Sequence, residues 1–187
     1  MGYLYKTLMK LIVIIISFIF YSCNPNNEAF TSTYKIDKKI STIQVENESL
    51  PFQWDAPTYW LPNEKSAMRS ASYLVPSKNG SADLSVIYLN GDGGGLAANV
   101  NRWRKQLNLV ELSEQEIIND GVDFKGEIGI FKIYEIINPE NNESAFLCSI
   151  IPAKDFTIFV KLNTYSENIS SLKKEFINFS SSFNYNE

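Results

Sequence analysis

Five segments of the chain are rich in β-branched and aromatic residues and are bounded by turn formers, which is the pattern of β-strands. We expect strands over 67–75, 82–89, 128–137, 144–151 and 156–162. Asn79 and Gly80 favour a hairpin between the first two strands, because this dipeptide adopts the tight turn that joins antiparallel neighbours. Turn formers at 139–142 and 152–155 separate the last three strands, which are therefore predicted to form an antiparallel meander.

Hydrophobic residues recur at helical spacing in two longer segments. The first follows the glycine-rich run 91–95, and its apolar positions are Leu96, Val100, Trp103 and Leu107. We predict a helix here, with Trp103 in the core. The second segment has its apolar face at Ile169, Leu172, Phe176 and Phe179. Ser166 is expected to cap this closing helix, because a serine hydroxyl satisfies a free N–H at a helix start.

A shorter helix is predicted between these two. Ser113 and Glu116 have the spacing of a capping box, and Gly121 is expected to end the helix that they begin. Taken together, the elements predict an α+β fold, an antiparallel β-sheet of five to seven strands with helices packed on it.

The start of the chain has a different pattern. Lys6 and Lys10 precede an apolar run over 11–20, which is too short to span a bilayer and is typical of an export signal. Ser22 and Cys23 follow at the distance of a cleavage site, and this arrangement resembles the lipobox of bacterial lipoproteins. In that family the cysteine is acylated and the signal is cut before it. An uncleaved anchor, or an ordinary signal with a chance cysteine, is the alternative.

These features predict three regions: a lipoprotein signal peptide over 1–22, a lipidated N-terminus and flexible tether over 23–48, and a single α+β domain over 49–187. The tether is polar and has little to bury, although residues 35–45 could add an edge strand. Asn24 follows Cys23, and no acidic run comes after it. We therefore expect a lipid anchor in the outer membrane of the cell envelope, with the domain facing the periplasm.

Composition narrows the possible functions. The chain has no histidine, which removes the usual general base and the usual zinc ligand. Residues 23–187 hold 15 basic and 21 acidic residues, a net charge of −6 that argues against a nucleic-acid partner. Cys148 lies in an apolar run and has no disulfide partner once Cys23 is acylated, so we expect it to be buried. No spacing indicates a metal or another cofactor, and we expect none.

Several short blocks carry a resemblance to known proteins. They are Trp54, Pro57 and Trp60; Met68, Arg69, Ala71 and Tyr73; Gly91, Asp92, Gly94 and Gly95; the run 98–106; and Ser182 with Phe183. With the order of elements, these blocks resemble an uncharacterised family of bacterial lipoproteins with a PsbP-like fold. The resemblance covers residues 50–185 and implies binding or assembly more than catalysis, by analogy of fold alone.

Two features are candidates for a binding site. The glycine-rich loop, with Gly93 and Gly94 at its centre, precedes a helix, and a helix N-terminus offers free N–H groups to anions. The alternative is that the glycines only allow a tight turn in which Asp92 caps locally. The helix that follows has polar residues suited to a protein interface or a carboxylate, namely Asn99, Asn101, Arg102, Arg104 and Gln106. A solvated helix face is the alternative.

Three functions remain open at this point. The first is a non-enzymatic accessory lipoprotein that binds another envelope protein through the glycine loop and the helix face. The second is an envelope hydrolase that uses carboxylates, for which two converging acids would be the sign. The third is a small-ligand or glycan binder, for which the sign would be an exposed Trp54 and Trp60 cleft beside Arg69 or Arg102.

Overall fold

The computed structural model describes residues 50–64, 68–78 and 80–186 of the 187-residue chain. The predicted signal peptide, Cys23 and the tether, including the possible strand over 35–45, lie outside the described residues. Within the part that is described, no helix is both long and apolar enough to cross a membrane.

A seven-stranded antiparallel sheet forms the centre of the domain, in the order β2-β3-β4-β8-β7-β6-β5. Its strands are β2 (Leu61–Pro62), β3 (Ala71–Ser77), β4 (Gly80–Asn90), β5 (Val122–Lys125), β6 (Ile130–Asn138), β7 (Asn141–Pro152) and β8 (Phe156–Thr164). The predicted hairpin is β3–β4, and the predicted meander is β6–β7–β8, so both are confirmed. The hairpin and the meander are joined by the pairing of β4 with β8, two strands that lie far apart in the sequence.

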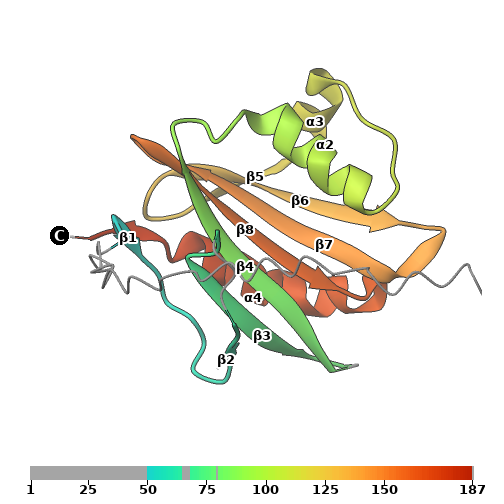
Figure 1. Ribbon diagram of the computed structural model, residues 1–187, viewed down its shortest axis with the longest axis horizontal. Coiled ribbons are helices and arrows are strands. Elements are labelled where there is room, and N and C mark those ends of the chain that lie inside the picture. Colours follow the sequence, from blue (N-terminus) through green and yellow to red (C-terminus); the bar gives the residue numbers. More distant parts are fainter. Residues whose placement is uncertain (1–49, 65–67, 79, 187) are drawn as a thin grey trace, which may run out of the picture. The chain divides into compact units, whose positions relative to one another are not determined.

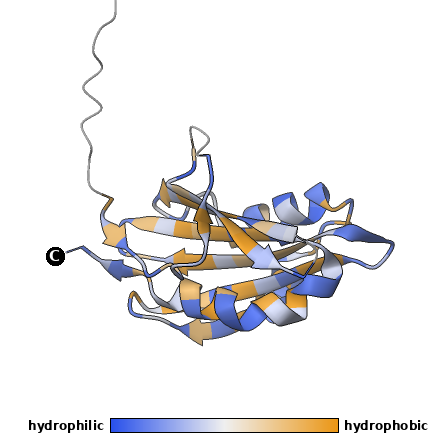
Figure 2. Ribbon diagram, turned by 90° about the horizontal axis from the view of Figure 1, so that it is seen from below, coloured by the Kyte–Doolittle hydropathy of each residue, from blue (hydrophilic) through white to orange (hydrophobic). Residues whose placement is uncertain are grey.

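Helices cover both faces of this sheet (Figure 1). On one face lie α2 (Leu96–Gln106) and α3 (Glu114–Asp120), which follow β4 in the chain. The opposite face is covered by α4 (Ile169–Ser181), which follows β8. In the ribbon coloured by hydropathy, the strands are mostly hydrophobic and the helices contain more hydrophilic residues, as expected for a sheet between two helical layers (Figure 2).

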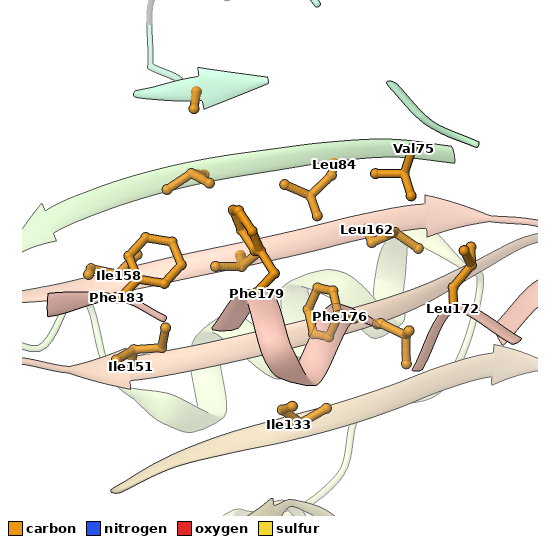
Figure 3. Packing of buried hydrophobic residues seen from close by; sticks show 14 of the residues in the cluster. Val75, Leu84, Ile133, Ile151, Ile158, Leu162, Leu172, Phe176, Phe179 and Phe183 are labelled. Atoms are coloured by element: carbon orange, nitrogen blue, oxygen red, sulfur yellow. The ribbon is translucent and has the colours of Figure 1, made fainter. Parts of the chain in front are cut away.

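The core beneath α4 is the larger of two hydrophobic clusters. The predicted apolar face of this helix is confirmed, because Ile169, Leu172, Phe176 and Phe179 are all at most 5% exposed. Figure 3 shows the α4 side chains pointing at strand residues such as Leu84 and Leu162. At about 1.5–3 kcal/mol for each large apolar side chain removed from water, this layer is a principal source of stability.

The core beneath α2 and α3 is built from the other side of the same strands. Trp103 is 3% exposed and packs edge-on against Phe159 of β8, so its predicted place in the core is confirmed. Cys148 of β7 is fully buried in this cluster, as expected. Tyr134 of β6 ties α3 to the sheet, because its hydroxyl donates to the carbonyl of Ile117 at 3.2 Å.

The local signals at the helix ends have mixed outcomes. Ser113 and Glu116 form the predicted capping box of α3. The predicted cap at Ser166 is wrong: a short 3-10 helix, η1 (Ser166–Asn168), precedes α4, and the hydroxyl of Ser166 donates instead to Asn142. The sequence pattern did not predict the two edge strands of the main sheet, β2 and β5, or a small second sheet. In that sheet β1 (Phe52–Gln53) pairs with β9 (Asn184–Tyr185) near the C-terminus.

Candidate functional site

A pocket of about 270 Å³ lies on the α2 side of the sheet, where β4 and β8 pass beside the helix; we call it the basic pocket. Its floor is made by alternate residues of the two strands. Ser85, Ile87 and Leu89 come from β4, and Phe159 and Lys161 come from β8. The register sets Ser85 opposite Lys161 and Ile87 opposite Phe159. Since side chains alternate across a strand, all five face the α2 layer and none enters the core under α4.

The walls of the basic pocket come from two separate parts of the chain. Arg102, Trp103 and Gln106 project from α2, and Met68 and Arg69 lie just before β3. The sequence blocks that contain these two sets are more than 25 residues apart. The pairing of β3 with β4, and of β4 with β8, brings them to one pocket.

Three cations line this pocket, and Arg69 is the one with a carboxylate partner. Its two terminal nitrogens donate to the two oxygens of Asp83 at 3.0 and 2.9 Å, which is a bidentate pair. Its Nη1 also donates to the hydroxyl of Ser72 at 3.2 Å. Arg69 is therefore already satisfied, and its charge is largely balanced.

Lys161 is half-buried and is the one charged residue of β8. Its Nζ donates to Oε1 of Gln106 at 2.9 Å and lies 4.5 Å from the ring centroid of Phe146. Burial lowers the pKa of Lys161, and the charges of Arg69 and Arg102 lower it further. The side chain is thus held in place by an uncharged acceptor and an aromatic face, without a carboxylate contact among the described residues.

Arg102 is the third cation, and it is exposed. Within the described ranges it has neither a hydrogen bond nor an ion pair to another side chain or to the backbone. Its guanidinium is close enough to Lys161 to contribute to the lowered pKa of that lysine. The basic pocket therefore presents one planar, unpaired cation at its mouth.

Apart from Arg102 and Gln106, the predicted site residues do not line the basic pocket. Asn99 is 4% exposed, and its amide nitrogen donates to the carbonyls of Gly93 and Gly95 at 3.0 and 2.7 Å. Gly93 has a φ of 62°, and a Cβ atom there would lie 2.5 Å from the ring of Phe159. Gly94 has a φ of 90°, and its N–H donates to Oδ1 of Asp92 at 2.9 Å. These contacts make the glycine loop a tight strand-to-helix turn.

Two further helix residues face the segment that follows α2. Asn101 makes a pair of hydrogen bonds with the backbone of Leu112, both at 2.9 Å. Arg104 donates from Nε to the carbonyl of Val110 at 2.9 Å. The polar residues of α2 therefore point in three directions, and Arg102 and Gln106 are the two that line the basic pocket.

The tryptophans expected near a ligand cleft lie on the other side of the sheet. Trp60 is 3% exposed, packs on Phe179 and donates from its ring nitrogen to Glu175 at 2.8 Å. Trp54 is half-buried and donates to the hydroxyl of Tyr73 at 3.0 Å. Both rings pack in the core under α4, whereas Arg69 and Arg102 line the basic pocket on the opposite side of the sheet.

Sequence reasoning missed Lys161 and the floor residues Ser85, Ile87 and Leu89. A signal for Lys161 was present, because it is the one charged residue in the strand run 156–162. A lysine inside an apolar strand needs a polar or aromatic partner. The floor residues had no signal of their own, because they are ordinary alternating positions of a strand.

A larger and more apolar pocket, of about 580 Å³, lies between the glycine loop and the β7–β8 turn. Asp92 and Asp123 both line it. Asp92 accepts from the backbone N–H of Gly94, and Asp123 pairs with Lys132 at 2.8 Å, so each carboxylate has a partner of its own. In the described ranges no three metal-ligating side chains come together.

No protein-family model matches the sequence. No curated protein matches it either. Among solved structures, the chain is similar to cyanobacterial PsbP (CyanoP) from Synechocystis, with 17% identity and a TM-score of 0.48 over 73% of this chain and 87% of that one. It is also similar to LpqN, involved in cell envelope biogenesis of Mycobacterium tuberculosis, with 12% identity and a TM-score of 0.43 over 73% and 83%. A protein from Bacteroides thetaiotaomicron has 11% identity and a TM-score of 0.43 over 73% and 46%.

One of these structures is a PsbP, the fold that the sequence blocks resemble. At such identities the likenesses concern the fold alone, and at TM-scores below 0.5 they carry no argument about function. The predicted α+β class is confirmed by the domain itself, which has a seven-stranded antiparallel sheet with helices packed on it.

Proposed function

We propose that this protein is a lipid-anchored, non-catalytic binding protein of the bacterial cell envelope, and that it binds a small anionic ligand in the basic pocket. The anchor would be Cys23, and the domain would face the periplasm from the outer membrane. The observation that carries the binding role is Arg102, a cation without a partner in the described residues, at the mouth of a pocket that already holds Lys161.

The pocket has the features of a ligand site rather than of a solvated helix face. Its cations come from α2, from β8 and from the segment before β3, so they converge from three elements. Ligand sites in proteins combine apolar walls with a few converging polar groups. The half-buried Ile87 and Leu89 supply such apolar surface beside the cations.

Native purification tests this proposal. The protein would be extracted with mild detergent from its own cells, and small molecules released on denaturation would be identified by mass spectrometry. An anionic compound should accompany the unaltered chain and be lost from Arg102→Ala. Lys105→Ala is the matched control, because Lys105 is an exposed cation on the same helix that does not line the pocket.

The two variants show whether the ligand binds in the basic pocket or elsewhere. Loss of the compound from Arg102→Ala but not from Lys105→Ala supports the basic pocket as the site. Equal retention by both variants would place the ligand elsewhere and contradict the proposal. Melting temperatures of the variants serve as the folding check, since Arg102 makes no hydrogen bond or ion pair within the described residues whose loss would destabilise the domain.

The same purification addresses a second candidate, an accessory protein for another envelope protein. One observation favours it: among the described residues, β5 ends the sheet and has a partner strand on one side alone, and Val122 of β5 and Ile130 of the neighbouring β6 are 53% and 69% exposed. Exposed edge strands are surfaces to which other chains add. Recovery of a stoichiometric protein, retained in Arg102→Ala, would favour this candidate over the ligand-binding role.

A further inference from the structure

The charges in the basic pocket leave room for one anionic group. Arg69 is neutralised by Asp83 in a bidentate pair. Lys161 is held by the oxygen of Gln106 and the ring of Phe146. Those partners of Lys161 are uncharged, so Lys161 and Arg102 both lack a carboxylate partner among the described residues. One anionic group placed between them can contact both. A guanidinium is a planar fork of donors, and a carboxylate matches it through two parallel hydrogen bonds.

The second donor for such a carboxylate is already in place. Lys161 has three N–H donors, and one of them is used by Gln106. Arg102 and Lys161 approach the pocket from α2 and β8, on either side of the same space. The two oxygens of a carboxylate there would accept hydrogen bonds from both Arg102 and Lys161. It would also compensate the partly desolvated ammonium.

The pocket also has apolar lining residues. Ile87 and Leu89 are half-buried on the strand floor, and the nearly buried rings of Trp103 and Phe159 line the pocket as well. A bare inorganic anion would leave this surface in contact with water. An apolar body attached to the carboxylate would cover it, and that burial adds to the affinity.

The size of the space limits that body. The basic pocket holds about 270 Å³, just below the range of roughly 300–1,000 Å³ that is typical of sites for drug-sized molecules. A single ring or a short alkyl chain fits this limit, whereas a nucleotide or an oligosaccharide does not.

Resting on the proposed function, we infer that the ligand class is a small monocarboxylic acid with an apolar body, its carboxylate held between Arg102 and Lys161 and its body on Ile87, Leu89 and Trp103. The pocket then discriminates by charge at one end and by apolar contact at the other. Neither feature alone defines the ligand.

Calorimetric titration of the full chain in detergent at pH 7 tests this inference with four probes. Benzoate has both features, benzamide lacks the charge, acetate lacks the apolar body, and inorganic phosphate is a compact anion. Benzoate should bind most tightly. Acetate and benzamide should each be weaker by about tenfold or more, because each loses one of the two contacts. Arg102→Gln should weaken benzoate by about ten- to a hundredfold, and Lys105→Gln should leave it unchanged.

Each other result has a defined meaning. Phosphate binding as tightly as benzoate would overturn the carboxylate class and leave an anion-binding pocket intact. Benzamide equal to benzoate would show that charge is not recognised, and would overturn the inference. Benzoate binding that is indifferent to Arg102→Gln would overturn both the inference and the proposed function. Failure of all four probes would overturn the ligand class, while the compound recovered from cells decides the proposed function separately.

Discussion

At the scale of single residues, the polar side chains of α2 show why residue type alone does not define a site. Asn99, Asn101 and Arg104 are the residue types that bind ligands, yet each is used by nearby backbone carbonyls or N–H groups. Those backbone groups lie in the connecting segments before and after α2, where regular secondary structure leaves many backbone groups without partners. Among the described residues Arg102 makes no such hydrogen bond and stays available for binding.

Cys148 gives a prediction at this scale. Burial raises the pKa of its thiol, so the native state keeps the proton at pH values where an unfolded cysteine, with a pKa of about 8.5, loses it. The unfolded state then binds fewer protons, and the free energy of unfolding should fall as the pH rises above about 8.5, by about 1.4 kcal/mol per pH unit. Cys148→Ala should lack this component.

Urea unfolding of both proteins between pH 7 and pH 10 measures this difference. Tyr134, whose pKa burial raises to about 12, produces a similar loss at higher pH, but it is present in both proteins and cancels in the comparison. A stability difference that does not change with pH would contradict the buried, protonated state of Cys148.

At the scale of elements, the glycine loop sets how α2 leaves β4. Gly93, Gly94 and Gly95 all have positive φ angles, which other residues adopt at a cost. The loop turns the chain from the strand into a helix that lies over the same sheet. Asn99 then fastens the first turn of that helix to the loop.

Two alanine substitutions test this structural role. Gly94→Ala meets no atom within 4 Å, so it should lower the free energy of unfolding by about 1 kcal/mol through backbone strain alone. Gly93→Ala has the same strain and also collides with the ring of Phe159, so the loss should reach about 2–4 kcal/mol. Chemical denaturation measures both values, and equal losses would argue against the close contact with Phe159.

The capping box of α3 shows an element end that the sequence determines locally. The hydroxyl of Ser113 accepts from the N–H of Glu116, and the carboxylate of Glu116 accepts from the N–H of Ser113. The pKa of Glu116 is lowered because its carboxylate accepts from the hydroxyl of Ser113 at 2.6 Å, which is the largest cause, and from the N–H of Ser113 at 2.8 Å. Every partner is within three residues, so the pattern was readable without a fold. Ser166, by contrast, was misread because its hydroxyl bonds to distant Asn142.

At the scale of the whole molecule, the site exists because the two helical layers are unequal. On the α2 side, Tyr134 of β6 and Cys148 of β7 are fully buried, whereas Ile87 and Leu89 of β4 are half-exposed. The helices therefore leave the β4 end of this face open. The basic pocket lies at the boundary between the covered and the open parts.

The proposed anchor leads to a prediction about the whole chain. Cys23→Ser should abolish labelling by radioactive palmitate and move the protein from the membrane fraction to a soluble or unprocessed form, because stable attachment needs acyl chains. Cys148→Ser is the matched control and should keep both the label and the membrane location. Membrane retention of Cys23→Ser would contradict the lipidation proposal.

The sequence by itself determined the elements and their local geometry. Strand and helix periods, the β3–β4 hairpin, the capping box and the apolar face of α4 depend on neighbours within a few residues, so the pattern contains them. The short strands β1, β2, β5 and β9 carry too few residues for a period to be visible.

Only the tertiary structure decided which polar residues form a site. The pairing of β4 with β8 set Lys161 beside Ser85, and the pairing of β3 with β4 brought Arg69 to the pocket that Arg102 lines, although these residues lie far apart in the chain. The directions of Asn99, Asn101 and Arg104 depended on backbone groups in the segments before and after α2. Such contacts are properties of the packed fold, because the free energy that selects them comes from burying both faces of the sheet at once.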